Sequence, residues 1–237
     1  MAANQFIQNF RTAANPQIVK RYAAGDLKGS KSLLLSSTKF SYYLMLILSL
    51  PICLVAEPLL QLWLGQVPEY SVIFLQLAII TSLFQVFDAS FYTALYAKGR
   101  IRENALISPT LGFLAFPITY ILFRIGCSPT SLAVILLINY AILGLVVKPI
   151  LLIKIVDYTF SDILKVFRPC FGVSVVGTIV PLILYIYRGN IFPGPLLQFV
   201  CLSVISILSV SVTVWFVGLE RDMKDKLQTI IKSKFKK

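Results

Sequence analysis

The chain has 237 residues, of which 57% are hydrophobic and 14% charged, and its 22 Lys and Arg residues outnumber its 10 Asp and Glu residues. Its mean hydropathy of +0.82 indicates more apolar surface than a soluble domain of this length buries in one core, which excludes a soluble globular protein. The basic residues fall between long apolar runs instead of covering one face of a soluble module, which excludes a nucleic-acid-binding protein.

The first segment, residues 1–27, is too polar to face lipid. Asn4, Gln8, Arg11 and Asn15 recur at intervals of four, three and four residues, which puts them on one face of a helix. Such a face can lie at membrane depth where it lines a water-filled cavity between helices. A helix on the cytoplasmic surface with a solvated face fits the same composition. The residues alone leave both interpretations open.

Six apolar segments follow, and a span of about 20 residues crosses the roughly 30 Å of hydrocarbon in a membrane. The aromatic stretch after the first segment, residues 58–65, suits the membrane interface or a shallow re-entrant turn. The sequence therefore predicts an all-α, polytopic transmembrane helix bundle of about six spans within residues 28–218. The predicted spans are residues 40–56, 70–96, 105–123, 129–153, 169–187 and 195–218.

Basic residues are distributed unequally between the two sides of these spans. Nineteen stand before the first span, in the second and fourth loops between spans, or after the last span. The loops on the other side carry two, Arg124 and Arg188. Because loops rich in Lys and Arg stay in the cytoplasm, we expect both ends of the bundle to face the cytoplasm.

The tail, residues 219–237, is both basic and periodic in its apolar residues. Its apolar side chains are spaced to share one face of a helix, with lysines on the other: Leu219, Met223, Leu227, Ile230, Ile231 and Phe235. This pattern predicts an amphipathic helix on an anionic membrane surface. A frayed, solvated tail is the alternative.

Two charged residues lie inside the predicted spans. A carboxylate near the bilayer centre costs about 2.5–3.5 kcal/mol, so Asp88 is not expected to face lipid. Asp88 either contacts a substrate or coupling ion, or pairs with a neighbouring helix and fixes packing. Lys148 lies near the cytoplasmic end of its span and is predicted to snorkel to the interface. In the longest cytoplasmic loop, Asp157 and Asp162 are interpreted as solvated charges.

The opening segment also carries a family resemblance. The strings NQF (residues 4–6), NFRTAANPQI (9–18) and RYAAGD (21–26) resemble the hallmark segment of bacterial Wzx-type polysaccharide and O-antigen flippases. These belong to the multidrug/oligosaccharidyl-lipid/polysaccharide exporter superfamily. Weaker resemblances continue in LQLWLGQVPEY (60–70) and YTALYAKGRI (92–101). The resemblance covers essentially the whole chain, although only the first set of strings is specific.

The resemblance implies a protein of the bacterial cytoplasmic (inner) membrane that exports a glycan linked to polyprenyl pyrophosphate. Such proteins have two helix bundles around a central cavity, so we expect this chain to be the C-terminal half, beginning in a partial cavity-lining helix and lacking its N-terminal bundle. Asn4, Gln8, Arg11 and Asn15 would then contact the substrate. Asp88 would couple transport to an ion.

Two other functions stay open from the sequence. One is an integral-membrane glycosyl- or acyltransferase of envelope biosynthesis, and the other is a scaffold that transports nothing. An enzyme of that kind usually needs paired acids or a histidine base at the membrane face. The chain has no histidine and no Asp-x-Asp motif, and its four cysteines are widely spaced, so we expect no catalytic residues, no metal site and no cofactor.

Overall fold

The computed structural model describes the fold of residues 2–191, 195–219 and 224. Every regular element in these ranges is a helix. They are α1 (Ala2–Ala23), α2 (Leu27–Leu54), α3 (Ala56–Leu64), α4 (Ser71–Ala97), α5 (Ile101–Arg124), α6 (Ser131–Ile142), the π-helix η1 (Leu143–Val147), α7 (Lys148–Ile155), α8 (Phe160–Ile186), α9 (Arg188–Ile191), α10 (Pro195–Thr213) and the π-helix η2 (Val214–Gly218).

Six of the described helices are long and apolar enough to cross a membrane. Two of these spans contain a π-helical segment: α6, η1 and α7 form one continuous span, and η2 completes the span that begins with α10. At 1.5 Å per residue, each exceeds the roughly 30 Å of a hydrocarbon core. The predicted all-α, polytopic bundle is therefore confirmed.

The first and fifth spans begin earlier than predicted. Helix α2 starts at Leu27 instead of residue 40. The Asp26 side chain caps this start by accepting a hydrogen bond of 2.8 Å from the Gly29 amide. Helix α8 starts at Phe160 instead of residue 169, behind a capping box. Lysines near these helix starts, Lys28, Lys31 and Lys165, do not end a helix, because lysine has a good helix propensity.

Two acidic residues that were interpreted as solvated differ in their surroundings. Asp162 belongs to the capping box of α8, where the Thr159 hydroxyl donates a 2.6 Å hydrogen bond to its carboxylate. It is buried, so the interpretation is wrong for this residue. Asp157 stays solvent-exposed while it pairs with Lys98 at 2.8 Å.

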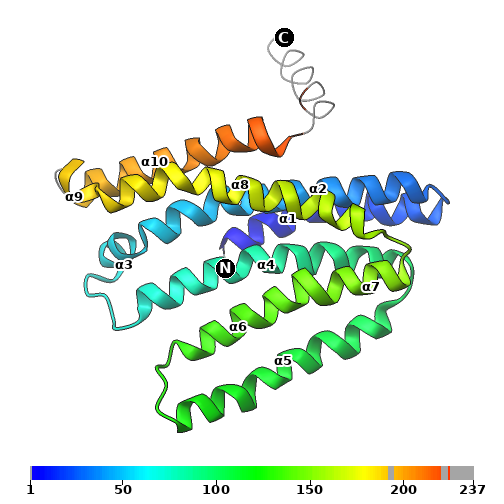
Figure 1. The fold of residues 1–237 in the computed structure, drawn as a ribbon, viewed down its shortest axis with the longest axis horizontal. Helices are drawn as coiled ribbons and strands as arrows, with labels where there is room; N and C mark the ends of the chain where they lie inside the picture. The colour runs from blue at the N-terminus through cyan, green and yellow to red at the C-terminus, as the bar shows by residue number, and fades with distance from the viewer. Residues whose placement is uncertain (1, 192–194, 220–223, 225–237) are drawn as a thin grey trace.

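The spans lie side by side in an order that differs from the chain order. Figure 1 shows them arranged across the molecule as α10, α8, α2, α4, α6 with α7, and α5. Helix α1 packs against both α2 and α4. The N-terminal segment therefore reaches the centre of the row, where the two most extensively packed spans meet.

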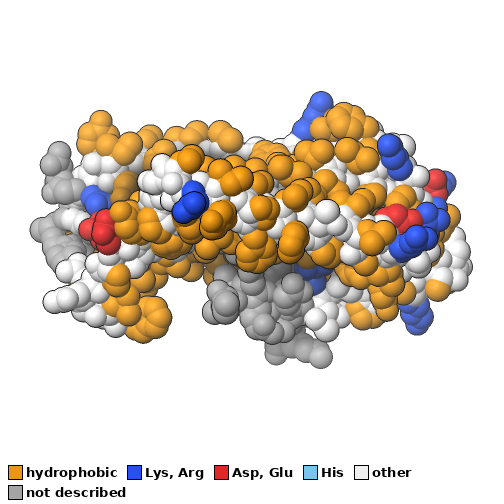
Figure 2. Space-filling model, turned by 90° about the horizontal axis from the view of Figure 1, so that it is seen from below, with side chains coloured by type: hydrophobic (Ala, Val, Ile, Leu, Met, Phe, Trp, Pro, Cys, Tyr) orange, Lys and Arg blue, Asp and Glu red, His pale blue; other side chains and the backbone are white. Residues whose placement is uncertain are grey.

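The core lies where α2, α4 and α8 meet. Tyr42 of α2 stacks on Phe87 of α4 with ring centroids 4.9 Å apart, and Phe87 meets Phe167 of α8 edge-on at 5.1 Å. The outer faces are apolar too: Phe113 and Phe116 of α5 are each 71% exposed. Figure 2 shows such hydrophobic side chains along the length of one face. A lipid bilayer provides the apolar surroundings that this surface needs.

Lysine and arginine side chains gather mostly at one end of the bundle, at the right of Figure 2. This is the end where the turns between α1 and α2, α4 and α5, and α7 and α8 meet in Figure 1. We call it the basic end. The predicted amphipathic tail, residues 219–237, lies outside the described residues apart from Leu219 and Lys224.

Candidate functional site

A pocket of about 800 Å³ lies between α1 and α4. It is formed where the polar face of α1 meets the second half of α4. Its lining residues are Arg11, Thr12, Asn15, Pro16, Val19 and Lys20 from α1 and Ala89, Tyr92, Thr93 and Tyr96 from α4. This composition, one buried arginine with amide, hydroxyl and phenol groups, is suited to a polar ligand with an anionic part.

Arg11 is held at the inner wall of this pocket. Arg11 is 5% exposed, and its guanidinium donates a hydrogen bond to the backbone carbonyl of Ala89. The Asp88 carboxylate also attracts the guanidinium electrostatically. The guanidinium group has five N–H donors in a fixed fork, so a carbonyl contact anchors the side chain without using its full capacity for hydrogen bonding.

Asn15 lies one helical turn beyond Arg11 in the same pocket. The Thr93 hydroxyl donates to the Asn15 side-chain oxygen across 3.3 Å, which links α1 to α4. Arg11 and Asn15, which are predicted to share one face of a helix, both line this pocket. Asn4 and Gln8 belong to the same helix, but their side chains lie outside the described residues.

An ion pair lies directly behind the pocket. Asp88 of α4 and Lys148 of α7 approach to 3.0 Å between Oδ1 and Nζ, with side-chain exposures of 21% and 2%. The prediction that Lys148 snorkels to the interface is therefore wrong. Its ammonium group has a carboxylate partner inside the bundle, which removes the need to reach the membrane surface. Asp88 faces protein, as the cost of exposing a carboxylate to lipid predicts.

Two further side chains complete the surroundings of Lys148. Its ammonium group donates a hydrogen bond to the Asn104 side-chain oxygen from α5, and the Ser108 hydroxyl donates to the same oxygen across 3.0 Å. The Lys148 ammonium also lies 5.4 Å from the centroid of the Tyr92 ring. Because Tyr92 lines the pocket as well, this residue borders both the ion pair and the pocket.

A close helix approach brings this ion pair together. Gly144, in the π-helical segment η1, lies so near α4 that a Cβ atom there would stand 2.8 Å from the Phe84 carbonyl oxygen. Lys148 follows Gly144 by four residues, and Asp88 follows Phe84 by four. The contact between Gly144 and Phe84 therefore sets the pair one turn further along both helices. π-helical segments often occur at functional sites.

The sequence alone did not reveal Asn104, Ser108 or Tyr92 as parts of this site. Each comes from a different turn or helix, and their only common feature in the sequence is that they are polar residues in or beside apolar runs. Among the described residues, no group of three or more His, Cys, Asp or Glu side chains could hold a metal ion.

These features define the chain as a multi-pass α-helical membrane protein with a polar pocket and a buried ion pair beside it. Comparisons with protein-family models, with curated proteins and with solved structures each found no match to this chain.

Proposed function

We propose that the chain is part of a membrane transporter that exports lipid-linked oligosaccharide during cell-surface polysaccharide biosynthesis, as its resemblance to Wzx-type flippases implies. The observation that carries the proposal is the pocket between α1 and α4. It places Arg11, a buried cation, beside amide and hydroxyl groups between two helices of a membrane bundle. Polar and ionisable groups between membrane helices are costly and are typical of substrate pathways.

The pocket chemistry suits both parts of this substrate. Arg11 would bind the phosphate or an acidic sugar, because a guanidinium matches their oxygens in a planar fork. Asn15 and Thr93 would exchange hydrogen bonds with sugar hydroxyls. Tyr92 and Tyr96 combine an apolar ring with a polar hydroxyl, which suits the two faces of a sugar ring.

Asp88 and Lys148 would couple transport of the substrate to the movement of a cation. In this proposal the Asp88 carboxylate changes partners between Lys148, Arg11 and an incoming cation as the transporter changes conformation. Intramembrane carboxylates serve in this way in many transporters. The three side chains come from α4, α7 and α1, so a change of pairing would move these helices relative to one another.

A second helix bundle would complete the transport path. Thr12, Pro16 and Lys20 line the pocket on α1 and remain exposed, and Lys20 in particular is unsuited to face lipid. Transporters of this kind alternate access by rocking two repeats about a shared site. The resemblance to Wzx-type flippases favours the bacterial inner membrane as the protein's location, and the distribution of basic residues favours both ends of the bundle facing the cytoplasm.

The transporter and the transferase alternatives differ in what accumulates when the gene is deleted. A lost transporter leaves lipid-linked oligosaccharide made but confined to the cytoplasmic leaflet, and surface polysaccharide falls. A lost transferase prevents the full-length lipid-linked oligosaccharide from forming. Quantifying both species in deleted and complemented cells decides between them. A deletion that changes neither would contradict both and favour the scaffold.

A further inference from the structure

A second pocket, of about 290 Å³, lies at the basic end between α2 and α8. It is separate from the pocket of α1 and α4 and shares none of its lining residues. The lining comprises Lys28, Lys31, Ser32, Leu35, Ser36 and Lys39 from α2 with Asp162 and Lys165 from α8. Four of these eight described lining residues are lysines, and one is acidic.

The α2 residues of this pocket form a single stripe. Their spacing along the sequence is three, one, three, one and three residues, which keeps all six on one face of the helix. From Lys28 to Lys39 the stripe runs about 16 Å along the axis. Lys39, the innermost of them, is 5% exposed, whereas Lys28 is exposed. The lysines thus extend from the membrane surface into the bundle.

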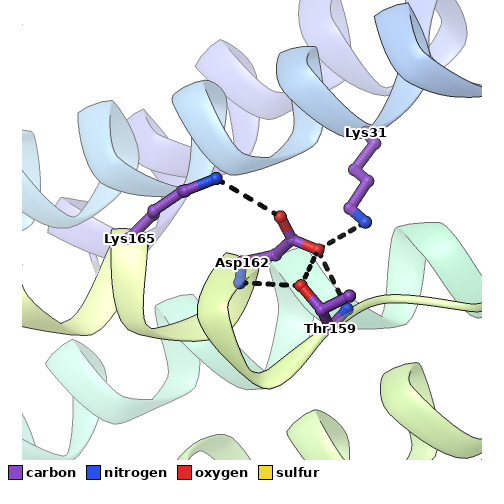
Figure 3. Close-up of polar contacts among 4 residues, drawn as sticks. All are labelled: Lys31, Thr159, Asp162 and Lys165. Carbon is purple, nitrogen blue, oxygen red and sulfur yellow. Dashed lines mark hydrogen bonds and ion pairs between the residues drawn. The ribbon is translucent and has the colours of Figure 1, made fainter.

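Asp162 fixes the position of two of the lysines. Figure 3 shows Lys31 from α2 and Lys165 from α8 converging on its carboxylate. The distance to Lys165 Nζ is 3.7 Å, and the Lys31 ammonium pairs with the other carboxylate oxygen. Thr159 holds that oxygen with its amide at 2.9 Å and its hydroxyl at 2.6 Å. The Lys31 ammonium also lies 4.8 Å from the Tyr158 ring centroid.

This arrangement leaves the pocket strongly cationic. The lining sets Lys28, Lys31 and Lys165 against one carboxylate, and that carboxylate is already bonded to Thr159 as part of the helix cap. Holding like charges together in a partly desolvated groove is unfavourable unless an anion joins them. Ser32 and Ser36 add hydroxyl donors along the stripe. Basic pockets between transmembrane helices at the membrane surface are suited to phosphate headgroups.

We propose that this pocket binds a phosphate group, that of an anionic phospholipid headgroup or of a soluble phosphate compound. The ammonium groups of Lys28, Lys31 and Lys165 contact the phosphate oxygens at the mouth of the pocket. The proposal rests on these contacts alone and is independent of what the protein transports.

The experiment measures ligand binding to the purified full-length chain in detergent by native mass spectrometry. The probes are short-chain phosphatidylglycerol, glycerol phosphate and phosphatidylcholine. The test variant is Lys28→Gln with Lys165→Gln, because both side chains are exposed. The matched control is Lys98→Gln with Lys154→Gln, which removes the same charge from the same end outside the pocket.

We expect phosphatidylglycerol to bind in preference to phosphatidylcholine. The test variant should bind it more weakly by roughly fivefold for each lysine removed, and the control should bind it like the wild type. If glycerol phosphate does not displace bound phosphatidylglycerol, the site is assigned to a lipid headgroup. If glycerol phosphate binds as well as phosphatidylglycerol and displaces it, the site is assigned to a soluble phosphate compound. An equal loss in test and control, or no loss in the test variant, would overturn the proposal.

Discussion

The Lys148 ammonium group pairs with the Asp88 carboxylate 3.0 Å away, inside a bundle whose outer surface is apolar. This contact joins α7 to α4 directly behind the pocket that holds Arg11. A buried pair contributes little net stability while intact, but breaking it leaves one uncompensated charge. Its consequences are therefore best measured by removing one partner and then both.

Asp88→Asn and Lys148→Met should each destabilise the protein by about 3–5 kcal/mol, since each leaves the other charge buried. The double variant should recover much of that loss because neither member of the pair is left without the other. Thermal unfolding in detergent measures all three. Additive losses in the double variant would show that the two side chains do not depend on each other.

The Asp88→Asn variant also tests whether transport is coupled to an ion. If Asp88 couples transport to an ion, Asp88→Asn should lower the export of surface glycan per molecule of membrane-inserted protein and change its ion dependence. Unchanged export rate and ion dependence after Asp88→Asn would leave only the packing role.

Gly144→Ala should separate η1 from α4. The added Cβ would stand 2.8 Å from a backbone oxygen, which cannot rotate away, so the helices must shift. We expect a loss of about 1–3 kcal/mol in stability. Gly112→Ala is the control, because nothing lies within 4 Å of a Cβ there. Its effect should be neutral or stabilising, by up to about 1 kcal/mol. Equal behaviour of the two variants would mean that the close approach is unimportant.

The native Cys127 reports the orientation of the bundle. It is exposed and lies between α5 and α6, at the end opposite the basic end. In intact cells with the outer membrane permeabilised, a membrane-impermeant thiol reagent should label wild-type protein but not Cys127→Ser. In the Cys127→Ser background, Gln66→Cys should be labelled, and Arg102→Cys should be labelled only after lysis. The reverse pattern would contradict the orientation that the basic residues predict.

Arg11 tests the substrate pathway. Arg11→Lys keeps the charge but loses the planar fork, so export should fall, and Arg11→Ala should reduce it further, by roughly 10- to 100-fold if a charge-assisted hydrogen bond to the substrate is lost. The readout is surface glycan per molecule of inserted protein, which separates transport from stability. Arg21→Ala, on the same helix but outside the pocket, should export normally. Equal export by wild type and Arg11→Ala would contradict a substrate contact and leave Arg11 a packing role.

Some of the site could be predicted from sequence. Arg11 and Asn15 share a helix face because their spacing is close to one turn, and that depends only on local geometry. Asp88 stood out because an isolated carboxylate is rare in an apolar run. The partner of Asp88 was not predictable in the same way, because 60 residues separate it from Lys148 in the printed sequence.

The helices, the number of spans and the segregation of basic residues could be predicted from the sequence alone, because hydropathy, periodicity and charge act over one or two turns of chain. Helix starts at Leu27 and Phe160 were missed where lysines interrupted the apolar runs. The tertiary structure decided the pairing of Lys148 with Asp88, the capping and pairing of Asp162, and both pockets. Each depends on which helices become neighbours. That choice is made by packing, as at Gly144 against Phe84, and packing between distant segments leaves no local pattern in the chain.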